Sequence, residues 1–184
     1  MSLTESQSMN VGTSAPRFTL PDTRNNAPVS TSDYDDKPLL IVFMCNHCPY
    51  VVHLVDALVE VAHDLAKQGT ATVCISSNDT QRYPQDGPEK MAQLAMNKGF
   101  DFPYCLDESQ DVARAYGAVC TPDIFLFDRS HQLYYHGQFD DTRPGQTIAA
   151  HGGDLIQAAH AMQADHPPPT NVLPSVGCSI KWKT

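Results

Sequence analysis

The sequence predicts one α/β domain built around a mixed β-sheet, and three observations lead to this fold class. Residues 39–44 (LLIVFM) form a continuous apolar run, which is typical of a strand buried on both faces. Apolar side chains then recur at helical spacing over residues 51–65, and residues 70–76 give a second, β-branched run. Residues 124–127 and 133–139 flank a polar turn and indicate an antiparallel hairpin.

The bounds of the other elements follow from proline and glycine residues, which end helices and strands. Residues 1–38 carry repeated prolines and indicate an extended, turn-rich lead-in. The first helix ends at Gly69, and residues 78–88 form a polar loop with two prolines and a glycine. We then expect, in chain order, a helix over 89–98, a strand over 101–106, a helix over 109–116, the hairpin, and a helix over 154–164.

A chain of 184 residues suits one ordinary domain, and no repeat or linker divides it. We expect residues 1–9 to be a disordered or artificially added leader and residues 10–164 to form the domain. Residues 165–184 are predicted to be a C-terminal tail that packs on the domain. The PPP run at 167–169 excludes a helix at the start of this tail.

The charge of the chain limits its partners. Twelve basic against 21 acidic residues give a net charge of −9, which repels phosphate backbones and anionic membrane surfaces. No apolar run approaches the ~20 residues of a membrane span, and residues 1–9 lack the pattern of a secretion signal. We therefore expect a cytoplasmic protein with no nucleic acid and no membrane among its partners.

The motif CNHC at residues 45–48 is the strongest candidate for chemistry. Cys45 follows the buried strand where a helix begins, so free backbone N–H groups and the helix dipole favour its thiolate. Cys48 lies one turn further on the same face, within reach of a disulfide with Cys45. His47 adds a cation when protonated, and Pro49 is tolerated in a first helical turn.

The same motif is also compatible with a metal site. A closed zinc site needs two further ligands, usually a second closely spaced pair, and the chain has no second C-x-x-C. A metal would have to recruit Cys120, Cys178, His53 or another histidine through the fold. Redox chemistry is therefore favoured over metal binding and over inert packing, and we assign no metal and no cofactor.

The sequence resembles the redoxin branch of the thioredoxin superfamily, the AhpC/TSA group related to peroxiredoxins. Three segments carry the resemblance in the expected order: residues 12–22 (GTSAPRFTLPD), the junction of strand and cysteine pair, and residues 119–128 (VCTPDIFLFD). The resemblance covers residues 10–164 and implies a thioredoxin-like three-layer fold, with a central mixed β-sheet flanked by helices, an N-terminal extension and a Pro-rich C-terminal tail. More narrowly, CNHCP together with residues 177–183 (GCSIKWK) is similar to peroxiredoxin-like proteins that carry a thioredoxin-type cysteine pair.

The resemblance implies that Thr121-Pro122 is a cis peptide packed against the cysteine pair. Its use would be to aim the backbone of Thr121 at a peptide that pairs with it like an added strand. An ordinary trans proline at the start of a strand is the alternative.

Two departures from the related families bear on the chemistry. When Cys48 and Pro49 are laid on the peroxiredoxin pattern Pro-x-x-x-Thr/Ser-x-x-Cys, Cys45 replaces the hydroxyl residue and Ile41 replaces the proline. Where thioredoxins have a tryptophan before the first cysteine and a buried aspartate, this chain has Met44 and Leu39. The proton acceptor for Cys48 is thus unassigned.

The remaining cysteines differ in their predicted roles. Cys74 and Cys105 lie in apolar strands and are expected to be core residues. Cys120 is either a core residue or a neighbour of the active site, because side chains alternate and only one of Cys120 and Thr121 can face the pair. Cys178 lies in a tail that Ile180 and Trp182 would anchor, where it either resolves a sulfenic acid or caps the core.

Two polar segments have open interpretations. The loop 78–88 either borders the active site, which in α/β folds lies at the carboxyl ends of strands, or is a plain insertion. Arg143 follows the hairpin, where a solvated turn with a local ion pair is favoured over contact with substrate.

The leading functional hypothesis is a thiol–disulfide oxidoreductase. Cys45 attacks a protein or small-molecule disulfide, Cys48 releases the product, and an external thiol reductant restores the pair. One alternative is a thiol peroxidase of the alkyl hydroperoxide reductase/thiol-specific antioxidant type, acting on a peroxide through a sulfenic acid. The other is a copper- or zinc-binding module that uses the two cysteines and a histidine.

Overall fold

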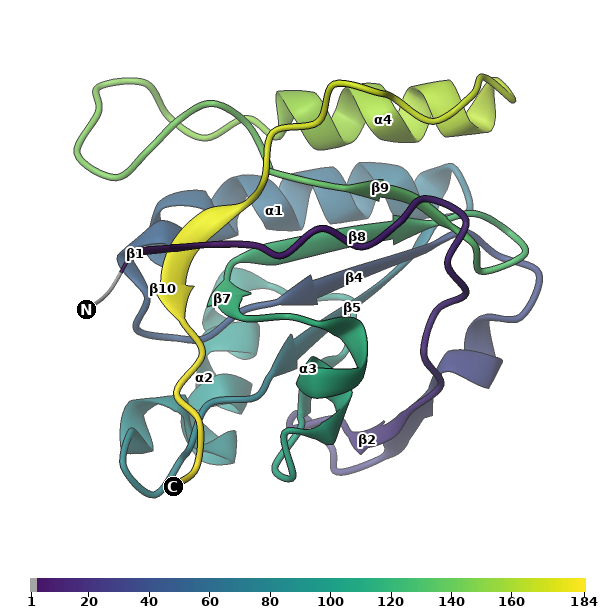
Figure 1. The fold of residues 1–184 in the computed structure, drawn as a ribbon. Helices are drawn as coiled ribbons and strands as arrows, with labels where there is room; N and C mark the ends of the chain where they lie inside the picture. Colours follow the sequence, from purple (N-terminus) through teal and green to yellow (C-terminus); the bar gives the residue numbers. More distant parts are fainter. Residues whose placement is uncertain (1–2) are drawn as a thin grey trace.

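The computed structural model describes residues 3–184, and at its centre lies a five-stranded sheet in the order β6-β5-β4-β8-β9 (Figure 1). The strands are β4 (Leu39–Phe43), β5 (Ala71–Ser76), β6 (Tyr104–Leu106), β8 (Asp123–Phe127) and β9 (Leu133–His136). Strands β4, β5 and β6 run parallel, whereas β8 and β9 pair antiparallel, so the sheet is mixed as predicted.

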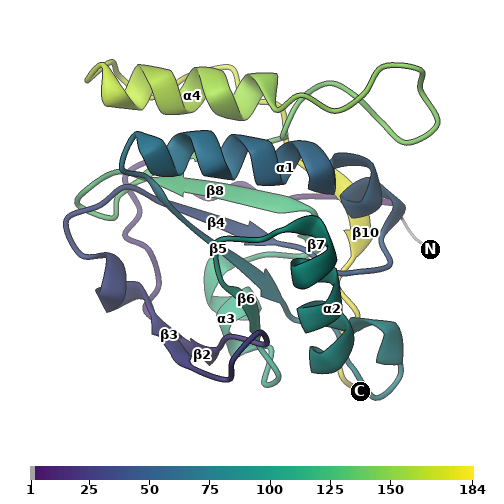
Figure 2. The same ribbon diagram turned by 180° about the vertical axis from the view of Figure 1, so that it is seen from behind.

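Helices cover both faces of this sheet. They are α1 (Pro49–Lys67), α2 (Pro88–Lys98), α3 (Asp111–Tyr116) and α4 (Gly153–Gln163), with short 3-10 helices η1 (Thr31–Tyr34) and η2 (Pro84–Asp86). Helices α1, α2 and α4 contribute to the core on one face, and α3 lies on the other (Figures 1 and 2). The result is the expected three-layer arrangement.

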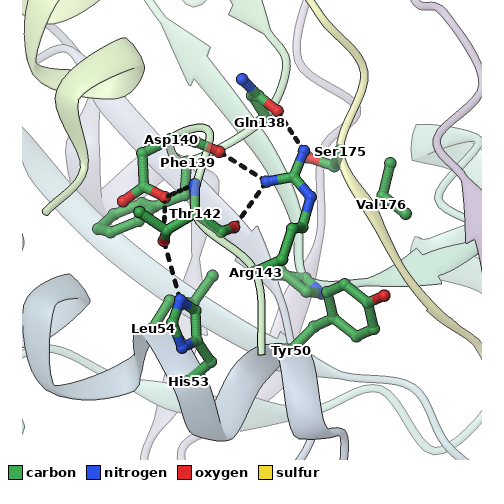
Figure 3. A pocket seen from close by; sticks show the side chains of 11 residues that line it. Tyr50, His53, Leu54, Gln138, Phe139, Asp140, Thr142, Arg143, Ser175 and Val176 are labelled. Atoms are coloured by element: carbon green, nitrogen blue, oxygen red, sulfur yellow. Dashed lines mark hydrogen bonds between the residues drawn. The ribbon is translucent and has the colours of Figure 1, made fainter. Parts of the chain in front are cut away.

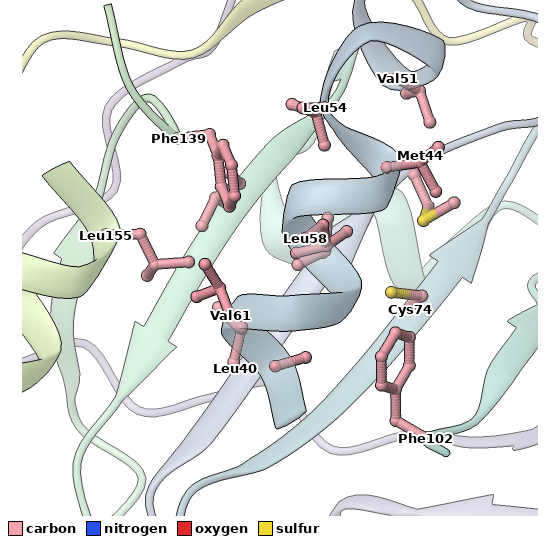
Figure 4. Close-up of a cluster of buried hydrophobic side chains, with 14 of the residues drawn as sticks. Leu40, Met44, Val51, Leu54, Leu58, Val61, Cys74, Phe102, Phe139 and Leu155 are labelled. Atoms are coloured by element: carbon pink, nitrogen blue, oxygen red, sulfur yellow. The ribbon is translucent and has the colours of Figure 1, made fainter. Parts of the chain in front are cut away.

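Strand β4 divides the core because its side chains alternate between the two faces. Leu40 packs with Leu58 and other residues of α1 (Figure 4), whereas Ile41 and Phe43 face the cluster around Tyr116 on α3. All five residues of β4 are buried. The strand is therefore fixed from both sides, and with it the position where the cysteine pair begins.

Two further sheets form at the edges. Strands β2 (Thr19–Pro21) and β3 (Pro28–Ser30) make a hairpin, and β1 (Leu3–Glu5), β10 (Val176–Ser179) and β7 (Cys120–Thr121) make an antiparallel three-stranded sheet. A disordered leader over residues 1–9 was the expectation. Residues 3–5 instead form β1, because β10 offers them a strand edge; residues 1–2 lie outside the described part.

The boundaries of two strands differ most from expectation, and the other predicted elements differ by one or two residues. Strand β6 begins at Tyr104 rather than at 101, after Pro103, whose nitrogen has no hydrogen to give to a ladder. Strand β9 ends at His136 rather than at 139, because the next segment turns to the tail and Gln138 N–H bonds to Leu173 O at 2.9 Å. Among the described residues, no helix is long and apolar enough to cross a membrane.

Candidate active site

The cysteine pair lies between β4 and α1, but the helix starts one turn later than the sequence argument assumed. Helix α1 begins at Pro49, and Cys48 is its N-cap, with extended backbone dihedrals of φ −68° and ψ 123°. Cys48 makes no side-chain capping hydrogen bond, but the nearby N–H of Val51 in the first turn lowers the pKa of the Cys48 thiol. Stabilisation by the helix start therefore falls on Cys48 and not on Cys45, which corrects the prediction.

The two thiols contact each other and the segment before Pro122. The Cys45 and Cys48 thiols lie close enough for each to shift the pKa of the other. The Cys45 sulfur lies 3.5 Å from Thr121 Oγ1, and the Cys48 thiol donates to Thr121 O at 3.1 Å. Cys45 is 1% and Cys48 0% exposed, so solvent does not reach the pair in this state.

The surroundings separate the acidities of the two thiols. The neighbouring Cys45 thiol lowers the pKa of Cys48 most, and Cys178 and the N–H of Val51 act in the same direction against the effect of burial. The pKa of Cys45 is raised by the neighbouring Cys48, by burial and by the nearby Asp86 carboxylate. The first proton that the reduced pair loses is accordingly that of Cys48, whose hydrogen bond to Thr121 O exists only while the thiol is protonated.

This charge distribution gives a titration that can be measured. The lowered pKa of Cys48 means that the thiolate is present at neutral pH and is lost only when the solution is acidified well below the usual range of cysteine. Thiolate ultraviolet absorbance of the reduced protein is expected to show this acidic step, which Cys48→Ser removes. Retention of the step in Cys48→Ser would assign the charge to another thiol.

Thr121-Pro122 is a cis peptide, as the resemblance implied. Thr121 is buried and contacts both sulfurs, one through its hydroxyl and one through its carbonyl oxygen. Cys120 is fully buried, and its thiol donates to Pro122 O at 3.8 Å. Of these two strand neighbours it is therefore Thr121 that faces the pair.

The loop 78–88 borders the site and supplies a carboxylate that sequence reasoning did not single out. Asp86 is fully buried, and its Oδ2 accepts from His47 Nδ1 at 2.7 Å and from Asn78 Nδ2 at 2.9 Å. Its Oδ1 accepts from Asn46 N–H at 2.9 Å. Tyr83 stacks on the His47 ring, with centroids 5.6 Å apart. The only signal for Asp86 in the sequence was its place in a loop after a buried strand.

Three donors at this place are close enough to share one metal ion. Ligand atoms of Cys45, His47 and Asp86 lie within 4.8 Å of one another. His53, which sequence reasoning had considered as a ligand, instead bonds to Thr142 Oγ1 at 2.8 Å.

Cys178 reaches the pair from the tail. Strand β10 places it directly opposite Thr121, whose carbonyl oxygen accepts from Cys48, and Cys178 lies close enough to lower the pKa of Cys48. Cys178 is 5% exposed. By contrast, Cys74 and Cys105 are buried in the two core clusters, as predicted, and burial raises the pKa of both.

A pocket adjoins the site on the side of α1 (Figure 3). Tyr50 near the start of α1, Pro122, and Val176 of β10 line it together with residues 138–140, Thr142 and Arg143. The Arg143 guanidinium is half-buried there and bonds to Gln138 Oε1 and to two carbonyl oxygens, so the expected solvated turn is wrong.

Comparison with known proteins agrees with this geometry. The profile of the AhpC/TSA family matches residues 11–136. A conserved protein of Geobacillus kaustophilus is 42% identical to this chain and superposes on it with a TM-score of 0.96. The match covers 100% of this chain and 97% of the Geobacillus chain. A hypothetical protein of Sinorhizobium meliloti is 44% identical at a TM-score of 0.95, covering 98% and 99%. A putative thioredoxin of Neisseria meningitidis is 22% identical and has a TM-score of 0.64. The match covers 82% of this chain and 90% of the Neisseria chain.

Comparison with curated proteins gives no match. The fold is thioredoxin-like, as the sequence predicted. The profile match spans more than half of the chain and contains the cysteine pair and the cis-proline strand. This chain therefore belongs to the AhpC/TSA family.

Proposed function

We propose that the protein is a thiol–disulfide oxidoreductase whose redox pair is Cys45 and Cys48. The observation that carries this proposal is the contact between the two thiols at the start of α1, where Cys48 receives the donors that stabilise a thiolate. A stabilised thiolate beside a second thiol is the arrangement that disulfide exchange requires.

The order of attack follows from the acidities. The Cys48 thiolate attacks one sulfur of a substrate disulfide, whose other sulfur leaves with the electron pair and takes a proton. Cys45 then loses its proton and attacks the Cys48 sulfur, which releases the second substrate thiol and leaves Cys45 and Cys48 joined. The proton of Cys45 passes to the substrate sulfur that leaves, and the His47 ring lies beside this step, with Nδ1 3.9 Å from the Cys45 sulfur and donating to Asp86. An external thiol reductant restores the pair.

The burial of the pair restricts the substrate. Cys45 and Cys48 are almost completely covered, so a large substrate needs β10 to move, whereas a small disulfide needs only local opening. The pocket between Tyr50, Pro122 and Arg143 is too small to hold more than a water molecule, so a substrate of any size needs the surroundings of the pair to open.

A redox titration tests the proposal. The protein is equilibrated with mixtures of reduced and oxidised dithiothreitol, thiols are blocked, and disulfides are mapped by mass spectrometry. A Cys45–Cys48 disulfide that forms reversibly, together with reduction of insulin or of a small aromatic disulfide, is the expected result. Absence of this disulfide across the whole range of mixtures would overturn the proposal.

Thiol peroxidase activity is the second candidate, because the family is AhpC/TSA and the thiolate lies on Cys48 at the helix start. The thiolate would attack the O–O bond of a peroxide, becoming a sulfenic acid as water or an alcohol leaves, and Cys45 would then form the disulfide with loss of water. Fast peroxide consumption by the reduced protein, with slow reduction of disulfides, would favour this candidate.

A further inference from the structure

The C-terminal strand occupies the place where a substrate strand would pair. Strand β10 runs antiparallel to β7, with Cys178 opposite Thr121 and Ser179 opposite Cys120 (Figure 1). Strand addition beside Thr121 is the way in which the resemblance implied that a peptide would bind. The chain's own tail therefore presents a cysteine to the redox pair in the position of a bound substrate.

Cys48 is the middle sulfur of a group of three. Its thiol donates to Thr121 O at 3.1 Å, and Thr121 is the residue that pairs with Cys178, so Cys178 lies beside Cys48. Cys45 and Cys178 each act on the pKa of Cys48, in keeping with this closeness. The antiparallel pairing of β10 with β7 holds the tail and the redox pair in fixed register.

Other residues of the tail also hold β10 close to β7. A Cβ on Gly177 would lie 1.9 Å from Thr121 O, so only glycine lets β10 come this near. On its other edge β10 is paired with β1, with Leu3 opposite Cys178. Beyond β10, Ile180 is buried in the core and Trp182 packs under the Arg114 guanidinium at 4.5 Å.

We propose that Cys178 is a third redox-active cysteine, which exchanges with the Cys45–Cys48 disulfide to form a Cys48–Cys178 disulfide. This inference rests on the proposed function and extends it. The Cys178 sulfur attacks the Cys48 sulfur, a new S–S bond forms between them, and the bond between Cys48 and Cys45 breaks. The electron pair leaves on Cys45, which takes the proton that Cys178 gives up, so the exchange needs no further oxidant or reductant.

The exchange moves the disulfide toward the surface. Cys178 belongs to a short sheet at the edge of the molecule, whereas Cys45 and Cys48 lie beneath it. A soluble thiol then has to displace only this edge sheet to reach Cys178, which is 5% exposed, and the start of α1 can stay in place. Cys178 thus transfers reducing equivalents between an external thiol and the Cys45–Cys48 pair.

The Cys45→Ser variant tests the proposal, because it leaves Cys48 and Cys178 as the two cysteines in contact. After mild oxidation with diamide, peptide mapping is expected to show the Cys48–Cys178 disulfide as the main species. It disappears in Cys45→Ser/Cys178→Ser and remains in Cys45→Ser/Cys105→Ala, the matched control. Partly oxidised wild-type protein, which carries no substitution, is expected to contain both the Cys45–Cys48 and the Cys48–Cys178 disulfides.

The two proposals fail in different ways. If wild-type protein forms only the Cys45–Cys48 disulfide, and Cys45→Ser gives intermolecular dimers or sulfenic acid at Cys48, the role of Cys178 is wrong and the proposed function stands. If no Cys45–Cys48 disulfide forms in wild-type or Cys178→Ser protein, the proposed function itself is wrong.

Discussion

Replacing Cys48 with serine is expected to reduce disulfide turnover to the rate measured without protein. Serine can still donate to Thr121 O, as the Cys48 thiol does at 3.1 Å, so the local structure is preserved. A hydroxyl is not ionised at neutral pH and cannot replace the thiolate as nucleophile. Reduction of insulin or of a small aromatic disulfide, followed by absorbance, measures the loss, and thermal unfolding checks that the variant is folded.

The order of attack has its own test. In Cys45→Ser/Cys178→Ser both thiols that can release product are gone, so a mixed disulfide between Cys48 and substrate is expected to accumulate. Cys105→Ala, which removes a buried thiol away from the site, should retain turnover. A mixed disulfide found on Cys45 in Cys48→Ser, with none on Cys48 in the double variant, would reverse the roles of the two cysteines.

Gly177→Ala is expected to have the largest effect on access to the site. The added Cβ would lie 1.9 Å from Thr121 O and 2.7 Å from the Thr121 carbonyl carbon, and backbone atoms cannot move aside cheaply. Overpacking of this kind costs about 1–3 kcal/mol, which corresponds to about a 5- to 150-fold larger population with β10 undocked. The reaction of the reduced cysteine pair with a bulky thiol reagent should accelerate by a similar factor.

Gly153→Ala is the control, because its Cβ would meet only the side chain of His151, which can turn away. Stopped-flow measurement of thiol modification, with Cys48 followed by mass spectrometry, compares the two variants with wild type. Equal rates for Gly177→Ala and wild type would show that β10 does not limit access to the pair.

Local patterns predicted most of the fold. The buried strand β4, the amphipathic helix α1 and the hairpin of β8 and β9 each follow from side chains within one short segment. Strands β1 and β10 were not predicted because VGCS and LTE carry weak strand signals. They form because the fold brings them together across almost the whole length of the chain.

The sequence predicted which residues form the site, but it assigned the thiolate to Cys45, whereas the structure favours Cys48. Cys45, Cys48, Thr121 and Pro122 do lie together, and Cys178 joins them. The position of Pro49 already favoured a helix that begins there, since proline is common at the first helical position. That placement would have made Cys48 the N-cap. The burial of an acidic residue such as Asp86 depends on contacts that no local pattern encodes.

One side-chain amide connects the C-terminus to the environment of the cysteines. Asn78 Nδ2 donates to Asp86 at 2.9 Å, and Asn78 Oδ1 accepts from the Lys181 backbone N–H at 2.8 Å. A partner that lifts the tail away therefore also loosens the carboxylate that holds His47. Because such coupling is reciprocal, ligands that fix the histidine strengthen the docking of the last residues. The position of the chain's end and the oxidation state of its sulfurs are thermodynamically linked.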